Sequence, residues 1–330
     1  MSDIPHSLLE NYTGRTILIT GAGGVIGSNL AEVLSDVNCN LNLLSRSELK
    51  IQGRKAITKS RMADLKEPSG WEDLMSRVDI IFHLASQTSV YSAEQDPLAD
   101  AQTNIEGMIN LLETVKKSGN RPVFIYSGTV TQAGMPEKTP MDENVIDSPI
   151  TLYDLSKLTA ERYLMQYIKQ GYVRGASLRL ANVYGPSRGC SKPGRGILNS
   201  IIQNALSGDE IFVYDNGRYM RDYVFITDVI TAFLHAGSKI NEINGRYFVI
   251  SSGKGTTIKD AFQTAINETS KYNNLEQEIK SKNLPRGLSE IEKRNFVGNP
   301  ESFCKATGWS PSFSLEKGVA KTVEAFIALK

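Results

Sequence analysis

Residues 16–34 read TILITGAGGVIGSNLAEVL, a short apolar run followed by a glycine-rich turn and then by apolar residues at helical spacing. The β-branched run at 16–20 predicts a strand, and the segment from Ile26 onward predicts a helix. Gly21, Gly24 and Gly27 therefore lie where a strand turns directly into a helix. Such a unit is typical of α/β folds with a parallel sheet.

This glycine turn has the spacing G-x-x-G-x-x-G. Glycine permits positive φ, its missing Cβ lets the backbone approach a pyrophosphate, and the helix N-terminus supplies unpaired N–H donors. We therefore expect Gly21, Gly24, Val25, Ile26 and Gly27 to bind a dinucleotide. The alternative is a tight turn that binds no ligand.

Strand-like runs separated by helical stretches continue along the chain, which predicts a parallel sheet covered on both faces. A loop rich in Gly, Pro and Ser follows at 187–196, and the tail at 254–330 is more helical and more polar. We predict an α/β fold, a Rossmann-type doubly wound parallel sheet with a smaller C-terminal substrate-binding domain. The further strand-like runs are 41–45, 78–85, 122–127, 175–181, 223–226 and 247–250. The expected domains are residues 14–186 with a returning segment at about 223–252, and residues 187–222 with 253–330.

Composition narrows the classes of partner. The 330 residues include 37 Lys+Arg and 36 Asp+Glu, for a formal net charge of +1. Without a basic block we expect neither a nucleic acid nor a membrane as a partner. The first residues do not resemble a signal peptide, so we expect a cytoplasmic protein. Three scattered cysteines and three histidines predict no metal site, which favours cofactor-borne chemistry.

The end of the second predicted strand bears on the choice of cofactor. An acidic residue there usually binds the ribose 2′-hydroxyl of NAD, but this chain has Ser45 and Arg46. A hydroxyl beside a guanidinium suits a 2′-phosphate, so NADP(H) is favoured and NAD(H) stays possible. The alternative is that Arg46 is a solvated loop cation.

Tyr153 and Lys157 stand four residues apart in YDLSK, which places them on one helix face. An ammonium beside a phenol lowers the phenol pKa and allows proton exchange with a sugar or alcohol oxygen. The spacing alone is weak evidence, but the pair follows a strand-like run that ends in the hydroxyls Ser127 and Thr129. Open parallel sheets carry their chemistry at such strand ends.

Taken together, the motifs resemble the extended short-chain dehydrogenase/reductase family, in its nucleotide-sugar epimerase/dehydratase branch. The similarity runs from about Thr16 to about Pro311, and the motifs occur in the family's order. They are TGAGGVIG at 20–27, HLAS at 83–86, N-x-x-G at 104–107, YSGT at 126–129, YDLSK at 153–157, RLANVYGP at 179–186 and RDYVFITDV at 221–229.

The resemblance implies roles for individual residues. Tyr153 would be the catalytic acid/base, Lys157 would lower its pKa and bind the nicotinamide ribose, and Thr129 would orient the sugar oxygen. Asn104 would support the active-site backbone. Further cofactor contacts would come from Asp64, Leu65, Leu84, Ala85, Ser86 and Ser127.

The later motifs match family positions that hold a nucleoside-diphosphate sugar. Asn182 and Arg221 would contact the diphosphate, and Tyr214 would stack on the base. The alternative for Arg221 is an ion pair with its neighbour Asp222. Additional substrate-binding candidates are Gly196, Ile197 and Arg286.

The resemblance also implies a homodimer that pairs the helix at 104–115 with the one at 153–167. Both stretches carry apolar residues at helical spacing, and the alternative is that these faces are intramolecular core. The residues concerned are Ile105, Met108, Ile109 and Leu112 on the first, and Leu158, Tyr163, Leu164 and Tyr167 on the second.

The reaction is narrowed by the two residues after Thr129. The family's dehydratases and decarboxylases have an acidic residue there, whereas this chain has Val130 and Thr131, which disfavours both activities. Since NADPH commonly serves net reduction, we favour an NADPH-dependent 4-ketoreductase of an NDP-4-keto-6-deoxyhexose. The alternatives are an NDP-hexose 4-epimerase with tightly bound NAD and a non-catalytic NADP(H)-binding regulator.

Overall fold

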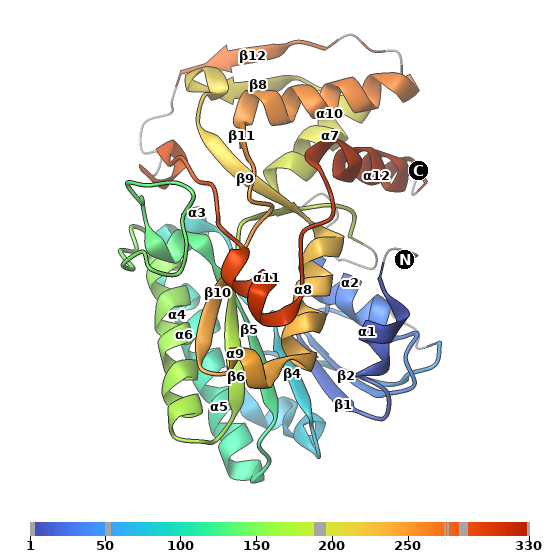
Figure 1. Cartoon of the computed structure of the whole chain (residues 1–330), viewed down its shortest axis with the longest axis vertical. Helices are drawn as coiled ribbons and strands as arrows, with labels where there is room; N and C mark the ends of the chain where they lie inside the picture. The colour runs from blue at the N-terminus through green and yellow to red at the C-terminus, as the bar shows by residue number, and fades with distance from the viewer. Residues whose placement is uncertain are drawn as a thin grey trace.

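A seven-stranded parallel sheet forms the centre of the molecule (Figure 1). The computed structural model describes residues 4–49, 54–187, 196–273, 275, 277–283 and 290–328. The sheet order is β10-β6-β5-β4-β1-β2-β3, so the chain reverses its direction of winding between β1 and β4. The strands are β1 (Thr16–Thr20), β2 (Asn40–Ser45), β3 (Ile57–Met62), β4 (Ile80–His83), β5 (Val123–Thr129), β6 (Arg174–Leu180) and β10 (Arg246–Ile250). The predicted Rossmann-type α/β fold is therefore confirmed.

Helices cover both faces of this sheet, as the continuous burial of successive residues in the central strands requires. Ile17 and Ile19 of β1 belong to one core cluster with Phe233, whereas Leu18 belongs to a second cluster with Leu112. The first face carries α2 (Val25–Leu34) and α8 (Ile226–Ser238), and the second carries α5 (Gly107–Ser118) and α6 (Leu152–Lys169). The remaining helices of this part are α1 (His6–Glu10), α3 (Val90–Gln95), α4 (Pro97–Ala101), α9 (Ile240–Ile243) and α11 (Glu301–Thr307).

Smaller sheets and three helices lie beyond one end of the main sheet, towards the top of Figure 1. One sheet has the order β11-β9-β7, and the other pairs β12 with β8. The strands are β7 (Asn182–Tyr184), β8 (Ile211–Tyr214), β9 (Met220–Phe225), β11 (Gly255–Thr257) and β12 (Ile279–Lys282). The helices are α7 (Ile197–Ser207), α10 (Ile258–Asn273) and α12 (Leu315–Ile327).

Two expectations about strands need correction. The run at 223–226 forms β9 only up to Phe225, because Ile226 begins α8, and β9 joins the small three-stranded sheet. The run at 78–85 is a strand only at Ile80–His83, after which the chain leaves the sheet. Residues 188–195 of the predicted loop lie outside the described residues.

Candidate active site

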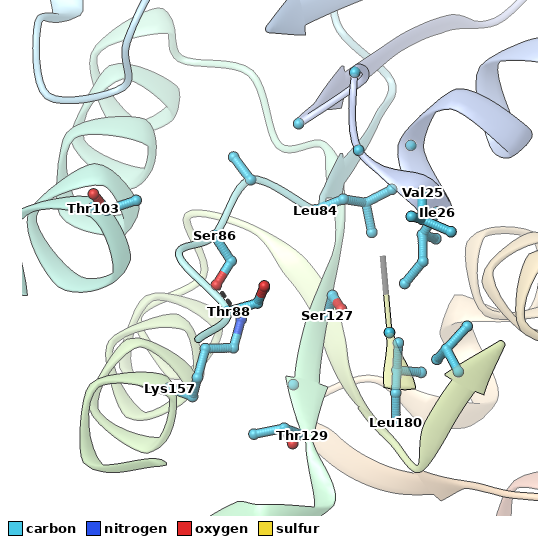
Figure 2. A pocket seen from close by; sticks show the side chains of 18 of the residues that line it. Val25, Ile26, Leu84, Ser86, Thr88, Thr103, Ser127, Thr129, Lys157 and Leu180 are labelled. Carbon is cyan, nitrogen blue, oxygen red and sulfur yellow. Dashed lines mark hydrogen bonds between the residues drawn. The ribbon is translucent and has the colours of Figure 1, made fainter. Parts of the chain in front are cut away.

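A pocket of about 590 Å³ opens where the chain leaves β1, β2, β4, β5 and β6. It lies at the point where the strand order reverses, which is where open α/β sheets bind ligands. Figure 2 shows its wall, with Leu84 and Ser86 after β4, Ser127 and Thr129 on β5, and Lys157 on α6. Predicted site residues that line the pocket are Gly21, Gly24, Val25, Ile26, Gly27, Ser45, Arg46, Asp64, Leu65, Leu84, Ala85, Ser86, Ser127, Thr129, Tyr153, Lys157, Asn182, Gly196 and Ile197.

The glycine turn leaves no space for side chains. Gly21 has φ +70°, and a Cβ on it would lie 2.6 Å from the backbone nitrogen of Ala85. A Cβ on Gly27 would collide with the carbonyl oxygen of Gly21. Gly24, the N-cap of α2, gives no side-chain cap, so the first amides of this helix are available to an anion at the pocket. These features fit a bound pyrophosphate.

At the end of β2, the hydroxyl groups of Ser45 and Ser47 lie next to Gly23 of the glycine turn. Ser45 is buried, and the Ser47 amide donates to its Oγ at 3.2 Å. A Cβ on Gly23 would lie 2.7 Å from the same Oγ. Arg46 is exposed, lines the pocket, and forms no ion pair with any described residue. Ser47 and Gly23 were not among the predicted residues, although they adjoin Ser45 and Gly24 in the sequence.

Lys157 is buried on α6 and reaches the pocket wall. Its Nζ donates to Ser86 Oγ at 3.3 Å, a bond drawn in Figure 2, and lies 4.4 Å from the ring centroid of Tyr126. Burial lowers the pKa of Lys157 to about 7, while the charges of Glu161 and Asp100 act in the opposite direction. The lysine can therefore change charge near neutral pH.

Asn104 lies behind the pocket wall rather than in it. Its Oδ1 accepts from Ser86 Oγ at 2.7 Å and from the Gln87 amide at 3.0 Å. Its Nδ2 donates to Asp100 Oδ1 at 3.0 Å. These bonds fix the backbone at Ser86 and Gln87, and with it the hydroxyl that Lys157 contacts.

Tyr153 and Thr129 approach the same space from two elements. Tyr153 stands in the first turn of α6, which a capping box of Thr151 and Asp154 fixes. Thr129 ends β5, and its Oγ1 lies 2.9 Å from Thr131 Oγ1. The pocket therefore brings together the predicted phenol, ammonium and hydroxyl.

At the far end of the pocket, Asn182 of β7 pairs in register with Tyr223 of β9, which also lines it. The Tyr223 hydroxyl is buried and has no hydrogen-bond partner in the described part of the chain. Tyr214 is partly exposed on β8, and neither it nor Arg221 lines the pocket. Arg286 lies outside the described residues.

Arg221 is buried, and it does not pair with Asp222 within the described chain. Its guanidinium donates to the carbonyl oxygens of Arg294 and Glu292, and it lies 3.7 Å from the Glu292 carboxylate. Asp222 instead accepts from Ser252 Oγ at 2.7 Å. The alternative of a neighbouring ion pair is therefore wrong, because residues 220–223 belong to a strand in which successive side chains point to opposite faces.

Arg294 is a candidate that the sequence did not single out. It is buried next to Arg221, and its Nε and Nη1 have no hydrogen-bond partner among the described residues. Burial, assisted by the charge of Arg221, lowers its pKa to about 10. A buried guanidinium with two unused donors is suited to an anionic ligand.

In the described ranges, no group of three or more His, Cys, Asp or Glu residues is arranged to hold a metal ion. None of the helices in the same ranges is long and apolar enough to span a membrane.

Comparison with known proteins places the chain in a family. Residues 17–251 match the model of the NAD dependent epimerase/dehydratase family. The UDP-glucose 4-epimerase of Mycolicibacterium smegmatis is 28% identical, over 94% of this chain and 97% of the relative. A decarboxylase of UDP-N-acetyl-α-D-glucosaminuronate from Bacillus cytotoxicus is 25% identical, over 94% and 98%.

A solved structure agrees with this family. The UDP-glucose 4-epimerase of Thermotoga maritima, with UDP-glucose, is 30% identical and has a TM-score of 0.83, covering 95% of this chain and 99% of that one. Both the sequence match and the structural match extend over the main sheet and the glycine turn. The chain is therefore a member of the NAD dependent epimerase/dehydratase family, within the extended short-chain dehydrogenases/reductases, and is an NAD(P)-dependent enzyme.

Proposed function

We propose that the protein acts at C4 of a nucleoside-diphosphate sugar, and that it reduces an NDP-4-keto-6-deoxyhexose with NADPH. The observation that carries this proposal is that Tyr153, Lys157 and Thr129 line one pocket together with the glycine turn. Val130 is buried and apolar, so the position after Thr129 offers no carboxylate for dehydratase or decarboxylase chemistry. A non-catalytic regulator would have no need of these three side chains together.

Each of the three groups has a distinct part in the reduction. When bound, the nicotinamide cofactor supplies hydride to the C4 carbon. Tyr153 donates its phenolic proton to the C4 oxygen as negative charge develops there. Lys157, held by Ser86, places an ammonium near the phenol and favours its ionised form after transfer. Thr129 donates a hydrogen bond that keeps the oxygen in line with the phenol.

The preference for NADP(H) rests on the end of β2. Ser45 and Ser47 lie next to Gly23 of the glycine turn, and the exposed Arg46 lies between them in the sequence. Arg46 has no carboxylate partner in the described chain. A 2′-phosphate would accept charge-assisted hydrogen bonds from these groups. An NAD site would instead place an acid there.

For the substrate, we propose that the sugar lies near Thr129 and the diphosphate near Asn182, Arg221 and Arg294. The unit at 187–222 and 253–330 would hold this nucleotide sugar, and the unit at 14–186 with 223–252 would hold the dinucleotide. The unused donors of Arg294 support the anion site. In this proposal Tyr214, Arg221 and Arg294 would reach the ligand only after local rearrangement, because none of them lines the pocket.

The second candidate is a 4-epimerase with tightly bound NAD, which the names of the relatives from M. smegmatis and T. maritima favour. One experiment separates the two reactions. Absorbance at the reduced-nicotinamide band is followed while purified protein is mixed with NADPH and candidate nucleotide sugars. Loss of absorbance with a 4-keto sugar supports the reductase, and isomerisation without added cofactor supports the epimerase. The absence of both reactions together with NADPH binding supports the regulator.

We also propose a homodimer through α5 and α6. Part of the predicted contact is intramolecular, since Met108, Leu112 and Leu164 are fully buried in one core cluster and the two helices pack together. Leu155 and Tyr163 of α6 stay exposed and would form the contact with a second copy. Light scattering at micromolar concentration tests this, and a monomer mass rejects it.

A further inference from the structure

Beneath the pocket, a buried carboxylate joins the helix of Tyr153 and Lys157 to strand β6 and to the segment that follows Thr129. Glu161 follows Lys157 by one helical turn on α6 and is almost completely buried. Its Oε2 accepts from Gln132 Nε2 at 3.1 Å and from Ser177 Oγ at 2.7 Å. Arg179 of β6 donates to both oxygens, from Nη2 at 2.6 Å and from Nε at 3.1 Å. One side chain of α6 therefore binds groups that follow β5 and groups on β6.

The link continues from Glu161 to Thr129. Gln132, which is fully buried, accepts at its Oε1 from the Thr129 amide at 2.8 Å. Because Gln132 uses its Nε2 towards Glu161 and its Oε1 towards Thr129, its amide spans the gap between helix α6 and the end of β5. The Thr129 hydroxyl in turn contacts Thr131 Oγ1, which fixes its direction.

The chemistry of Glu161 determines which way the Gln132 amide points. An ionised carboxylate can only accept hydrogen bonds, so it selects the NH₂ end of Gln132 and leaves the carbonyl end for the Thr129 N–H. A group that could also donate would permit the reversed amide, which would place NH₂ against the Thr129 N–H. Because Glu161 only accepts, the Gln132 carbonyl oxygen faces the Thr129 amide and accepts its hydrogen bond.

The side chains that connect Glu161 to Thr129 are also closely packed. A Cβ on Gly128 would lie 2.8 Å from Ser177 Oγ, 3.0 Å from Gln132 Oε1 and 3.1 Å from Arg179 Cγ. The strand residue next to Thr129 thus packs directly on the groups that Glu161 holds. A change in those groups would move the end of β5.

We infer that Glu161 is a positioning residue that, through Gln132, holds Thr129 in register with Tyr153 and Lys157, an inference that rests on the proposed function of these three residues. Glu161 does not line the pocket. Its second partner, Arg179, also binds Asp147, with Nη2 to Oδ2 at 3.0 Å. Asp147 therefore offers a matched control, since it shares the buried arginine but does not contact Gln132 in the described chain.

The test compares Glu161→Gln with Asp147→Asn. Both remove one carboxylate charge from Arg179, so both should lower the melting temperature. Only Glu161→Gln replaces one carboxylate oxygen of this network by an NH₂ group, which then faces either Gln132 or Arg179 Nη2. Displacement of a catalytic group by about 1 Å can cost about a hundredfold. We expect kcat to fall about ten- to hundredfold in Glu161→Gln with KM nearly unchanged, and to stay within about twofold in Asp147→Asn. Equal losses of kcat in the two variants, or no loss in either, overturn the inference.

Two double variants show whether the effect passes through Gln132 and Thr129. In Glu161→Gln combined with Gln132→Glu, the carboxylate is at position 132 and the amide is at position 161. The carboxylate can then accept from both the Thr129 amide and the side-chain amide at position 161, so kcat should recover by about fivefold or more. In a Thr129→Val background the hydroxyl is already missing, so Glu161→Gln should cost less than about threefold further. Glu161 also raises the pKa of Lys157, and an effect through the lysine would persist in Thr129→Val and contradict the inference.

A readout independent of turnover separates this inference from the proposed function. Hydrogen exchange at the Thr129 amide should be faster in Glu161→Gln than in Asp147→Asn, because only the first variant changes the group that Gln132 contacts. Equal exchange overturns the positioning role even in an inactive protein. An inactive wild type with the expected difference in exchange rejects the proposed reaction and supports the link.

Discussion

At one end of the pocket, Gly21, Gly27 and Ser45 come from a single strand–turn–helix–strand unit, whereas at the other end Asn182 and Tyr223 come from the separate strands β7 and β9. The first end is made largely of backbone, because a side chain at Gly21 or Gly27 would collide with it. The second end is made of side chains. The buried Tyr223 hydroxyl has no partner in the described chain, and Arg294, which is buried beside Arg221 and does not line the pocket, also has unused donors. The end of the pocket that is built from backbone follows from a local sequence pattern. The end that is built from side chains depends on tertiary packing.

The sharpest way to test the middle of the pocket, where the two ends meet, is Tyr153→Phe. Loss of a general acid typically lowers the rate by about a hundred- to ten-thousandfold, while the aromatic ring and both ligand ends stay in place. We expect kcat to fall by that factor with cofactor and nucleotide affinities nearly unchanged. Steady-state kinetics and fluorescence titration measure the two quantities.

Tyr272→Phe is the matched control, because Tyr272 is exposed on α10, which takes no part in the proposed dimer contact. Its kcat should equal that of the wild type. If Tyr153→Phe retained more than about a tenth of the wild-type kcat, the proton donor would be another group, and the reading of the pocket would be wrong.

Arg294→Met removes the buried guanidinium that we propose for the diphosphate and leaves the cofactor end of the pocket unchanged. A charge-assisted hydrogen bond contributes about 1.5 to 3 kcal/mol, so the nucleotide sugar should bind about ten- to a hundredfold more weakly, with little change in cofactor affinity. Isothermal titration with the nucleotide sugar measures this. Arg218→Met serves as the control, since Arg218 is an exposed arginine of the same region with an ion pair to Asp215.

Equal affinity for the nucleotide sugar in the Arg294 variant and the wild type would show that the buried guanidinium has no anion to bind. The comparison between the two ends would then lose its main support at the substrate end. A loss of cofactor affinity of the same size would show that the two ends are not independent.

The difference between the two ends also explains what the sequence could predict. The glycine turn, Ser45 and the YDLSK pair are local patterns, and the structure brings all of them to one pocket. Arg294 has no local signature, because its burial follows from the packing of β9 against residues 290–296. Arg221 matches a motif, yet its donors bind backbone carbonyl groups in this structure.

The same reasoning applies to the strands. β1 and β4 and the first half of β5 are mostly apolar, since helices cover both faces of the sheet, and these runs predict the strands to within a few residues. β3 is an edge strand with the polar sequence ITKSRM and mostly exposed side chains, so hydrophobicity gave no indication of it. The three-residue strands β7 and β11 are too short to show a period of two.

Arg46→Ala tests the side chain that we propose for the 2′-phosphate, at the end of the pocket that is otherwise built largely from backbone. If Arg46 binds a 2′-phosphate, its loss should cost about 1.5 to 3 kcal/mol for NADPH and almost nothing for NADH. The ratio of the two dissociation constants, measured by fluorescence titration, should therefore approach one in the variant. Arg54→Ala is the control, because Arg54 is a surface cation paired with Glu32 and Asp36. Equal affinities of the wild type for NADPH and NADH would reject NADP(H) preference.

The smallest expected effect concerns Lys157, which lies between the two ends. Burial lowers its pKa from 10.5 to about 7, so between these values the unfolded chain holds a proton that the folded chain has lost. Stability then rises with pH, because the unfolded state binds more protons. Below about pH 7 both states are protonated, and this contribution no longer changes with pH.

For a folded pKa of about 7, raising the pH from 7 to 8 should stabilise the cofactor-free protein by about 1 kcal/mol through this group. Urea unfolding of the wild type and of Lys157→Met at the two pH values isolates the effect, since the other titrating groups are shared. We expect the difference between the two free energies of unfolding to shift in favour of the wild type as the pH rises. A difference independent of pH would mean that Lys157 keeps its proton in the folded chain, and that its charge is held through neutral pH by Glu161 and Asp100.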